Sequence, residues 1–361
     1  MKRTILLFFV LFSILLFTVP AYTADTNDIE SSIQQESLQR VEAVVYGAPG
    51  AGGMFLRLGR VERDLFGMEL PGSLTERQQA LLTFVEEGTP TQPSLVFKIS
   101  VAEWVTMNRV NPSQPLADRM AILEMALEGE PQMGALSARL ERVLTRLLPN
   151  GVFSAPATIP SGTVIKAAFA RTVTVRNVAR GDIVELNATE DLIINGVLAV
   201  AQGDRVFGEV TRVRTPRSFG RPSEISIEFV EVETVSGRRT PVTLGPESRR
   251  AMEIDSGTIG AAGASIAGLV LLGPLGLAGG FLVRGSDRQI PEGSLMYVET
   301  TEAFTTTGYP IAGGQTMPAP APVVQTDDFI YSDPSAGQST SDFVPIDDFS
   351  TQTPPPSEHF Y

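Results

Sequence analysis

The chain has 361 residues, with 28 basic residues against 41 acidic ones and a formal net charge of −13. So acidic a chain is a poor nucleic-acid binder, because neutralising phosphates requires clustered positive charge. It has no cysteine and a single histidine, His359, which argues against disulfides, thiolate chemistry, histidine-ligated zinc and histidine general bases. We therefore expect no cofactor, no metal and no enzymatic activity; a hydrolase built on paired carboxylates stays formally open.

Residues 1–24 have the composition of a secretory signal peptide. Lys2 and Arg3 precede a short apolar run, and small residues follow, so that cleavage is predicted after Ala21 or Ala24. An uncleaved anchor is the alternative, but the apolar run is short for a span of about 20 residues. We expect an exported protein in the periplasm, in the outer membrane or at the cell surface.

Residues 41–150 carry a repeat of about 20 residues, preceded by a linker and helix start at 25–40. An apolar residue, a glutamate, four variable residues and a glycine form each copy, and an arginine follows: Glu42–Gly47 with Arg57, Glu62–Gly67 with Arg77, and Glu124–Gly129 with Arg139. The glycines predict left-handed helix stops. No short helix buries its apolar face alone, so the repeat predicts a stacked helical array.

Two features of this region leave alternatives open. Ser73 and Glu76 form a capping-box pattern, but the middle copies at 81–120 are degraded, and 94–100 has the sequence of a strand. An ordinary small helical bundle with accidental similarities is the alternative to a true repeat. The regular copies resemble the "LExxLFG" helical repeats of exported proteins from several bacterial groups, and that resemblance implies no activity.

Residues 151–301 change to a strand pattern after a short Ala/Pro/Thr linker. Three related turns, IPSGT, AQGDR and IPEGS, each launch a β-branched run, and Asn195-Gly196 is a strong hairpin signal. Six or seven such runs predict an antiparallel β-barrel or sandwich. The apolar phase slips between Phe229 and Val230, which predicts a β-bulge there. The fold class is therefore expected to be α+β.

The 256–284 region of this β-domain contains a long stretch without charge, residues 258–283. Pro274 near its middle disfavours one continuous helix, so we expect an inserted helical hairpin whose glycine ridges allow close backbone contact. The predicted membrane or self-association contacts are Gly260, Gly263, Gly268, Gly273, Pro274, Gly276 and Gly280. The expected partners are a second copy of the chain, the envelope membrane, or both. The alternative is a pair of helices that covers the open end of the barrel.

Arginines gather near two neighbouring turns of the β-domain. Arg212, Arg214, Arg217 and Arg221 form a candidate anion-binding loop, with Arg238 and Arg239 nearby. That loop would suit a soluble periplasmic or surface binding module. The simpler alternative is ion pairing across the hairpin with Glu224, Glu228, Glu231 and Glu233.

Residues 302–361 have eight acidic residues, nine prolines and no lysine or arginine, which predicts a disordered tail. Short acidic-phenylalanine motifs recur in it, at Asp327-Asp328-Phe329, Asp342-Phe343 and Asp347-Asp348-Phe349. They are candidate docking motifs for a protein partner, and chance recurrence in a biased tail is the alternative.

The order of turns, strands and apolar insertion over 159–301 resembles the β-barrel domain of the channel-forming core subunit of type IV secretion systems. The resemblance rests on turn residues: Ile159-Pro160, Gly162-Thr163, Gly203-Asp204, Gly208, Ile290-Pro291 and Gly293. In that family the barrel carries a helical hairpin that reaches the outer membrane. The glycine-rich hairpin of this chain itself predicts a membrane-associated or self-assembling scaffold or channel-like component of the cell envelope. The family's inner-membrane helix and proline-rich arm are replaced here by the predicted signal peptide and helical repeat, so only barrel architecture carries over.

Overall fold

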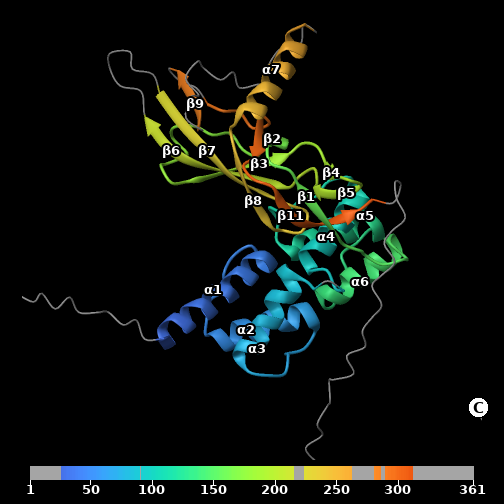
Figure 1. Cartoon of the computed structure of the whole chain (residues 1–361). Helices are drawn as coiled ribbons and strands as arrows, with labels where there is room; N and C mark the ends of the chain where they lie inside the picture. The colour runs from blue at the N-terminus through green and yellow to red at the C-terminus, as the bar shows by residue number, and fades with distance from the viewer. Residues whose placement is uncertain (1–25, 90, 215–222, 262–279, 286–288, 312–361) are drawn as a thin grey trace, which may run out of the picture. The chain divides into compact units, whose positions relative to one another are not determined.

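The structure is a computed structural model that describes residues 26–89, 91–214, 223–261, 280–285 and 289–311 (Figure 1). All of these residues belong to one compact unit of the chain. The predicted signal peptide and the tail beyond residue 311 lie outside the described residues.

The N-terminal part is an array of short helices, as the repeat predicts. Its elements are α1 (Thr26–Tyr46), α2 (Met54–Phe66), α3 (Leu74–Leu82), a π-helical turn η1 (Thr83–Glu87), α4 (Leu95–Met107), α5 (Leu116–Glu128) and α6 (Leu136–Leu147). Gly47, Gly67 and Gly129 each have a positive φ at a helix end, and Ser73 forms the predicted capping box with Glu76. The stacked helices share one apolar core.

The glutamate and arginine of each repeat copy form a buried ion pair, which we call the clasp. In the first copy Arg57 Nε donates to Glu42 Oε1 over 3.0 Å, and the backbone N–H of Gly50 donates to Glu42 Oε2 over 2.9 Å. Glu62 pairs with Arg77 and Glu124 with Arg139 in the same bidentate way. Each clasp therefore ties the end of one helix to the start of the next.

The structure contains a fourth clasp that the sequence pattern missed. Glu103 pairs with Arg119 through bonds of 3.0 and 2.7 Å, and the N–H of Asn111 donates to the same carboxylate. Asn108 stands where the other copies have glycine and adopts the same left-handed conformation, with φ 55°. Asparagine tolerates this conformation better than most residues, so the copy is intact in three dimensions.

The remaining connection, between α3 and α4, lacks the clasp. Thr83 occupies the glutamate position and Lys98 the arginine position, while Gly88 keeps the glycine and a positive φ of 67° but has an extended ψ of −177°. Lys98 pairs instead with Glu141 of α6. The helix end is π-helical here, with the N–H of Gly88 bonded to the carbonyl of Thr83. The degradation of the middle copies is therefore confined to this connection.

The possibility that 94–100 is a strand is wrong, because these residues begin α4. Ser94 caps the helix by accepting a bond from the N–H of Phe97 over 3.2 Å. Every residue from Leu95 to Glu103 except Lys98 is buried. A helix buried all round loses the one-sided apolar pattern that marks a surface helix, which explains the misleading sequence.

The β-domain consists of antiparallel strands in two sheets. Their bounds are β1 (Ala155–Ile159), β2 (Val164–Phe169), β3 (Ile183–Ala188), β4 (Leu192–Ile194), β5 (Val197–Val200), β6 (Arg205–Arg214), β7 (Ser223–Glu233), β8 (Arg239–Thr243), β9 (Gly280–Gly285), β10 (Leu295–Thr300) and β11 (Phe304–Pro310). Six strands close into a barrel in the order β6-β3-β2-β10-β8-β7, with β7 returning to β6 and β9 added along β7. A smaller sheet has the order β1-β11-β5-β4. Of the two predicted alternatives, an antiparallel barrel or a sandwich, the barrel is confirmed.

Local turn chemistry also agrees with the sequence. Gly162, Gly203 and Gly293 have positive φ in the three launching turns, and Asn195-Gly196 forms the β4–β5 hairpin with positive φ at both residues. Phe207 and Gly208 of β6 pair with Glu231 and Phe229 of β7. Val230 is thus the extra residue of a bulge, at the predicted place.

Three strands were not predicted from the sequence. β1 lies in the supposed linker after residue 151, and β11 lies in the supposed tail from residue 302, so the sheet extends to Pro310. The prediction that the second arm of the inserted hairpin is helical is wrong for residues 280–285. These residues, including Gly280, form strand β9, which pairs with β7. The first arm begins earlier than expected, since helix α7 spans Pro246–Ala261 and contains Gly260.

Breaking one clasp should destabilise the protein strongly. Arg119→Met removes the partner of Glu103, whose side chain is 1% exposed, and an uncompensated buried charge costs about 3–5 kcal/mol. Urea unfolding should show that loss. Arg63→Met is the control, because the Arg63–Glu69 pair is about half exposed and should cost about 1 kcal/mol or less. Equal losses for the two variants would contradict the clasp account.

The clasps should also make stability fall in acid. Burial alone would raise the pKa of Glu124, but bonds from Arg139 and from the Gln132 N–H outweigh it and lower the pKa below 4.5. Because the folded pKa lies below the unfolded one, the contribution is complete above about pH 4.5 and is lost as pH falls through the folded pKa. Urea midpoints between pH 7 and pH 3 measure it. Glu124→Gln should flatten this dependence relative to Glu130→Gln at an exposed site; parallel curves would count against it.

Candidate functional site

Helix α4 is the element that docks the array on the β-domain. Phe97 and Val101 from α4 and Val110 from the loop after it pack in one buried cluster with Leu198, Ala201 and Val235 of the β-domain. Trp104 and Tyr309 lie edge to face with ring centroids 6.0 Å apart at the rim of this cluster. The two parts are therefore held together by an apolar core of their own.

Polar contacts fix the register of this docking. Trp104 Nε1 donates to Asp191 Oδ2 over 2.8 Å, and the N–H of Val110 donates to the carbonyl of Gln202 over 2.8 Å. A Cβ placed on Gly203 would lie 2.0 Å from the Val110 carbonyl oxygen. Glycine is therefore required in the AQGDR turn for two reasons. It adopts the left-handed φ of 100°, and its lack of a side chain allows the helical array to approach closely.

The same turn contains a fully buried carboxyl group, Asp204. Its Oδ2 accepts a bond from the N–H of Ala201 over 2.7 Å, which fixes the turn before β6. Burial raises the pKa of Asp204 well above its ordinary value, and the backbone bond opposes that rise only in part. The bond to Ala201 gives the group a structural role in the turn.

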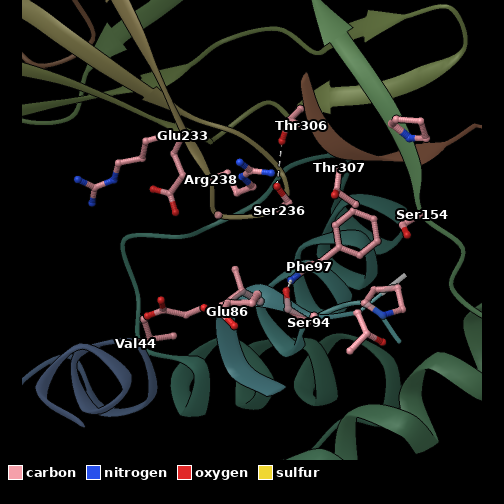
Figure 2. A pocket seen from close by; sticks show the side chains of 18 of the residues that line it. Val44, Glu86, Ser94, Phe97, Ser154, Glu233, Ser236, Arg238, Thr306 and Thr307 are labelled. Atoms are coloured by element: carbon pink, nitrogen blue, oxygen red, sulfur yellow. Dashed lines mark hydrogen bonds between the residues drawn. The ribbon is translucent and has the colours of Figure 1, made fainter. Parts of the chain in front are cut away.

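A cavity of about 940 Å³ lies beside this docking core, with one wall from the helices and one from the strands. Figure 2 shows Glu86 and Ser94 on the helical side and Glu233, Ser236, Arg238 and Thr306 on the strand side. Residues from β11 and from the start of β1 complete the strand wall. The helical wall comes largely from 86–89 and 93–94, which belong to the connection without a clasp.

Four arginines and three glutamates line the cavity: Arg40, Arg205, Arg238, Arg239, Glu86, Glu87 and Glu233. Arg40 pairs with Glu86 over 2.8 Å and Arg205 with Glu233 over 2.7 Å, while Arg239 pairs over 3.3 Å with Glu231. Burial raises the pKa of Glu86 despite the nearby arginines. The lining residues have a formal charge of +1, and Arg238 is the lining arginine for which the described residues supply no ion pair, since Arg239 is paired with Glu231.

The predicted insertion is anchored to the barrel at its first helix. Met252 of α7 is buried in the barrel core, and the N–H of Ser248 donates to Glu299 Oε2 over 2.6 Å. Asp255 accepts a bond from Tyr297 and lies 3.2 Å from Lys166 Nζ; the Tyr297 bond, with Lys166, lowers the pKa of Asp255. Gly263, Gly268, Gly273, Pro274 and Gly276 lie outside the described residues. Within the described part, no helix is both long and apolar enough to cross a bilayer.

The structure describes two of the four arginines of the candidate anion-binding loop, Arg212 and Arg214. Arg212 and Arg214, at the end of β6, lie 3.3 and 3.5 Å from the carboxylate oxygens of Glu224 across the β6–β7 hairpin. These two arginines therefore have the ion-pair partner that the simpler alternative names. Arg217 and Arg221 lie outside the described residues. Across the ranges that the structure covers, no three metal-ligating side chains come together.

Sequence reasoning missed the cavity, because its lining comes from distant parts of the chain. The predicted tail includes three residues of the lining, Thr305, Thr306 and Thr307. Arg205 belongs to the AQGDR turn, whose sequence gives no sign of a cavity. The one available signal was the pair of substitutions at Thr83 and Lys98, which interrupt the repeat where the helical wall forms.

Comparisons with known proteins add little. No family model matches the sequence, and no curated protein matches it. Among solved structures the chain is similar to ComB10 of the Com type IV secretion system of Helicobacter pylori, at 13% identity over 41% of this chain and 89% of that one, with a TM-score of 0.22. The sequence resemblance proposed for 159–301 names the same kind of system, but a structural similarity at this TM-score carries no argument about function.

Substituting Gly203 should separate the array from the β-domain. Gly203→Ala combines an unfavourable left-handed φ with the clash against Val110. Gly181→Ala is the matched control, since Gly181 lies in a similar Gly-Asp turn with φ 89° and nothing within 4 Å of an added Cβ. The control should cost about 1–2 kcal/mol, and Gly203→Ala at least about 2 kcal/mol more.

The sole tryptophan makes this test specific. Trp104 lies at the docking interface, so its emission should shift to the red in Gly203→Ala and stay unchanged in Gly181→Ala. Unchanged emission in both variants, with equal losses of stability, would contradict the described docking.

Proposed function

We propose that the chain is an exported, non-catalytic scaffold of the cell envelope that associates with the membrane or with copies of itself through the 256–284 insertion. The observation that carries the proposal is the anchoring of the uncharged stretch at its two ends. α7 is tied to the barrel at Met252 and Asp255 just before the stretch begins, and β9 is paired with β7 where it ends.

This arrangement supports a contact element. Residues 258–283 contain no ionisable side chain, and apolar surface on that scale marks an interaction site in a soluble protein. A closed barrel has no free sheet edges of its own, so it suits the role of a rigid base. The glycines at 260, 263, 268, 273 and 276 favour close backbone approach by a second helix or copy.

The buried charged side chains of the helical array and the barrel support a structural function. Most of the buried charged groups described above form structural contacts in the clasps, in turns and at the α7 anchor. Arg212 and Arg214 already share Glu224, which weakens the alternative of a soluble module that binds anions through this loop. The partner of the acidic-phenylalanine motifs in the tail stays a prediction.

Envelope fractionation tests the proposal. The protein should stay in the membrane fraction through high-salt and alkaline washes and should need detergent for release. Leu269→Glu with Leu271→Glu should move it to the soluble fraction, because each charge costs about 3 kcal/mol in the apolar part of a bilayer. Ile193→Glu is the control, since Ile193 is 48% exposed on β4 and should leave fractionation unchanged.

Mass measurement of the detergent-extracted particle then distinguishes lipid contact from self-association. A particle larger than one chain that the double glutamate variant dissociates supports assembly through the insertion. Quantitative release of the unaltered protein by salt alone would rule out the proposal.

A further inference from the structure

The cavity between α4 and the β-domain has unused binding capacity. Arg238 is exposed, and its guanidinium lies 5.4 Å from the ring centroid of Phe304. Among the described residues, no carboxylate lies within ion-pair distance of Arg238. Thr307 and Ser154, both in the lining, likewise form no side-chain hydrogen bond within the described ranges. The cavity is therefore lined by a cation without a carboxylate partner and by two hydroxyl groups without side-chain hydrogen bonds to the described residues.

The helical wall gives a second, independent indication. Every other helix connection from α1 to α6 has a glutamate–arginine clasp, whereas Thr83 and Lys98 replace both residues at the connection that lines the cavity. Thr83 and Lys98 are not themselves in the lining, but Glu86, Glu87, Gly88, Thr89, Pro93 and Ser94 between them are. Departures from a consistent structural pattern concentrate at functional sites, so the interrupted copy coincides with the expected place for a ligand.

The volume of the cavity and the sequence of the nearby sheet edge, strand β1, favour a small ligand over a peptide strand. A volume of about 940 Å³ is within the range of small-molecule sites. A peptide would most readily add to the free edge of β1, but Pro156 in that strand has no N–H to offer and blunts such an edge.

We propose that this cavity binds a small anionic sugar, whose carboxylate or phosphate group is held by Arg238 and whose hydroxyl groups bond to Thr307 and Ser154. Arginine recognises both kinds of oxyanion through charge-assisted bonds, and the threonine and serine hydroxyls can both donate and accept. The lining contains four arginines against three glutamates. This site is separate from the 256–284 insertion and does not depend on membrane association.

Calorimetric titration of the full chain tests this site, at fixed ionic strength, with glucuronic acid, glucose 6-phosphate and glucose as probes. At least one of the two acids should bind about tenfold or more tightly than glucose, since bonds to a charged group exceed neutral ones. The acid that binds identifies the anionic group as carboxylate or phosphate.

Variants then locate the binding. Arg238→Gln should weaken binding of that acid about tenfold or more, and Thr307→Val about threefold. Arg180→Gln, an exposed arginine outside the lining, should bind as the unaltered protein does. Because Arg238 is exposed, its variant should melt within about 2 °C of the unaltered protein, which separates lost binding from lost folding.

Three results would overturn the proposal. One is glucose binding as tightly as the acids, and another is equal effects of Arg238→Gln and Arg180→Gln. The third is the absence of binding heat from all three sugars. This result would overturn the proposal even if an acidic peptide such as hexaglutamate, titrated in the same way, did bind.

Discussion

The buried glutamate–arginine clasp is the interaction on which the helical array depends. Glu42, Glu62, Glu103 and Glu124 are each at most 1% exposed, and a carboxylate at that depth is very unfavourable without a partner. A bidentate arginine from the next helix supplies the partner, and in three copies a loop N–H adds a bond. One residue thus fixes a helix end, a loop and the following helix, which sets the spacing of the array.

The place where the clasp is absent is as informative as the places where it occurs. Between α3 and α4 the helix ends in a π turn, Lys98 reaches across to Glu141, and the wall of the cavity forms. The next helix, α4, is buried against both the array and the β-domain. The array is therefore regular where it supports itself and irregular where it meets the strands.

Sequence reasoning recovered the features that local chemistry determines. Glycine stops, the Ser73 capping box, the Asn195-Gly196 turn and the bulge at Val230 each depend on a few adjacent residues. The helix at 95–107 was ambiguous because burial on all sides removes its periodicity. β1 and β11 were missed because Ala155–Ile159 and Phe304–Pro310 become strands by pairing with distant segments: β1 with β11, and β11 also with β5. The cavity could not be predicted, since its residues meet only after the array docks.

Hydrogen exchange at the loop amides that donate to the clasps tests this account most directly. The N–H groups of Gly50, Asn111 and Gln132 lie in loops, where amides ordinarily exchange fast. The clasps predict that these three exchange about 100-fold or more slowly than the neighbouring amide of Met133, whose side chain is 94% exposed. Arg139→Met should remove the protection at Gln132 alone. Exchange of all three amides at the rate of Met133 would contradict the central role of the clasps.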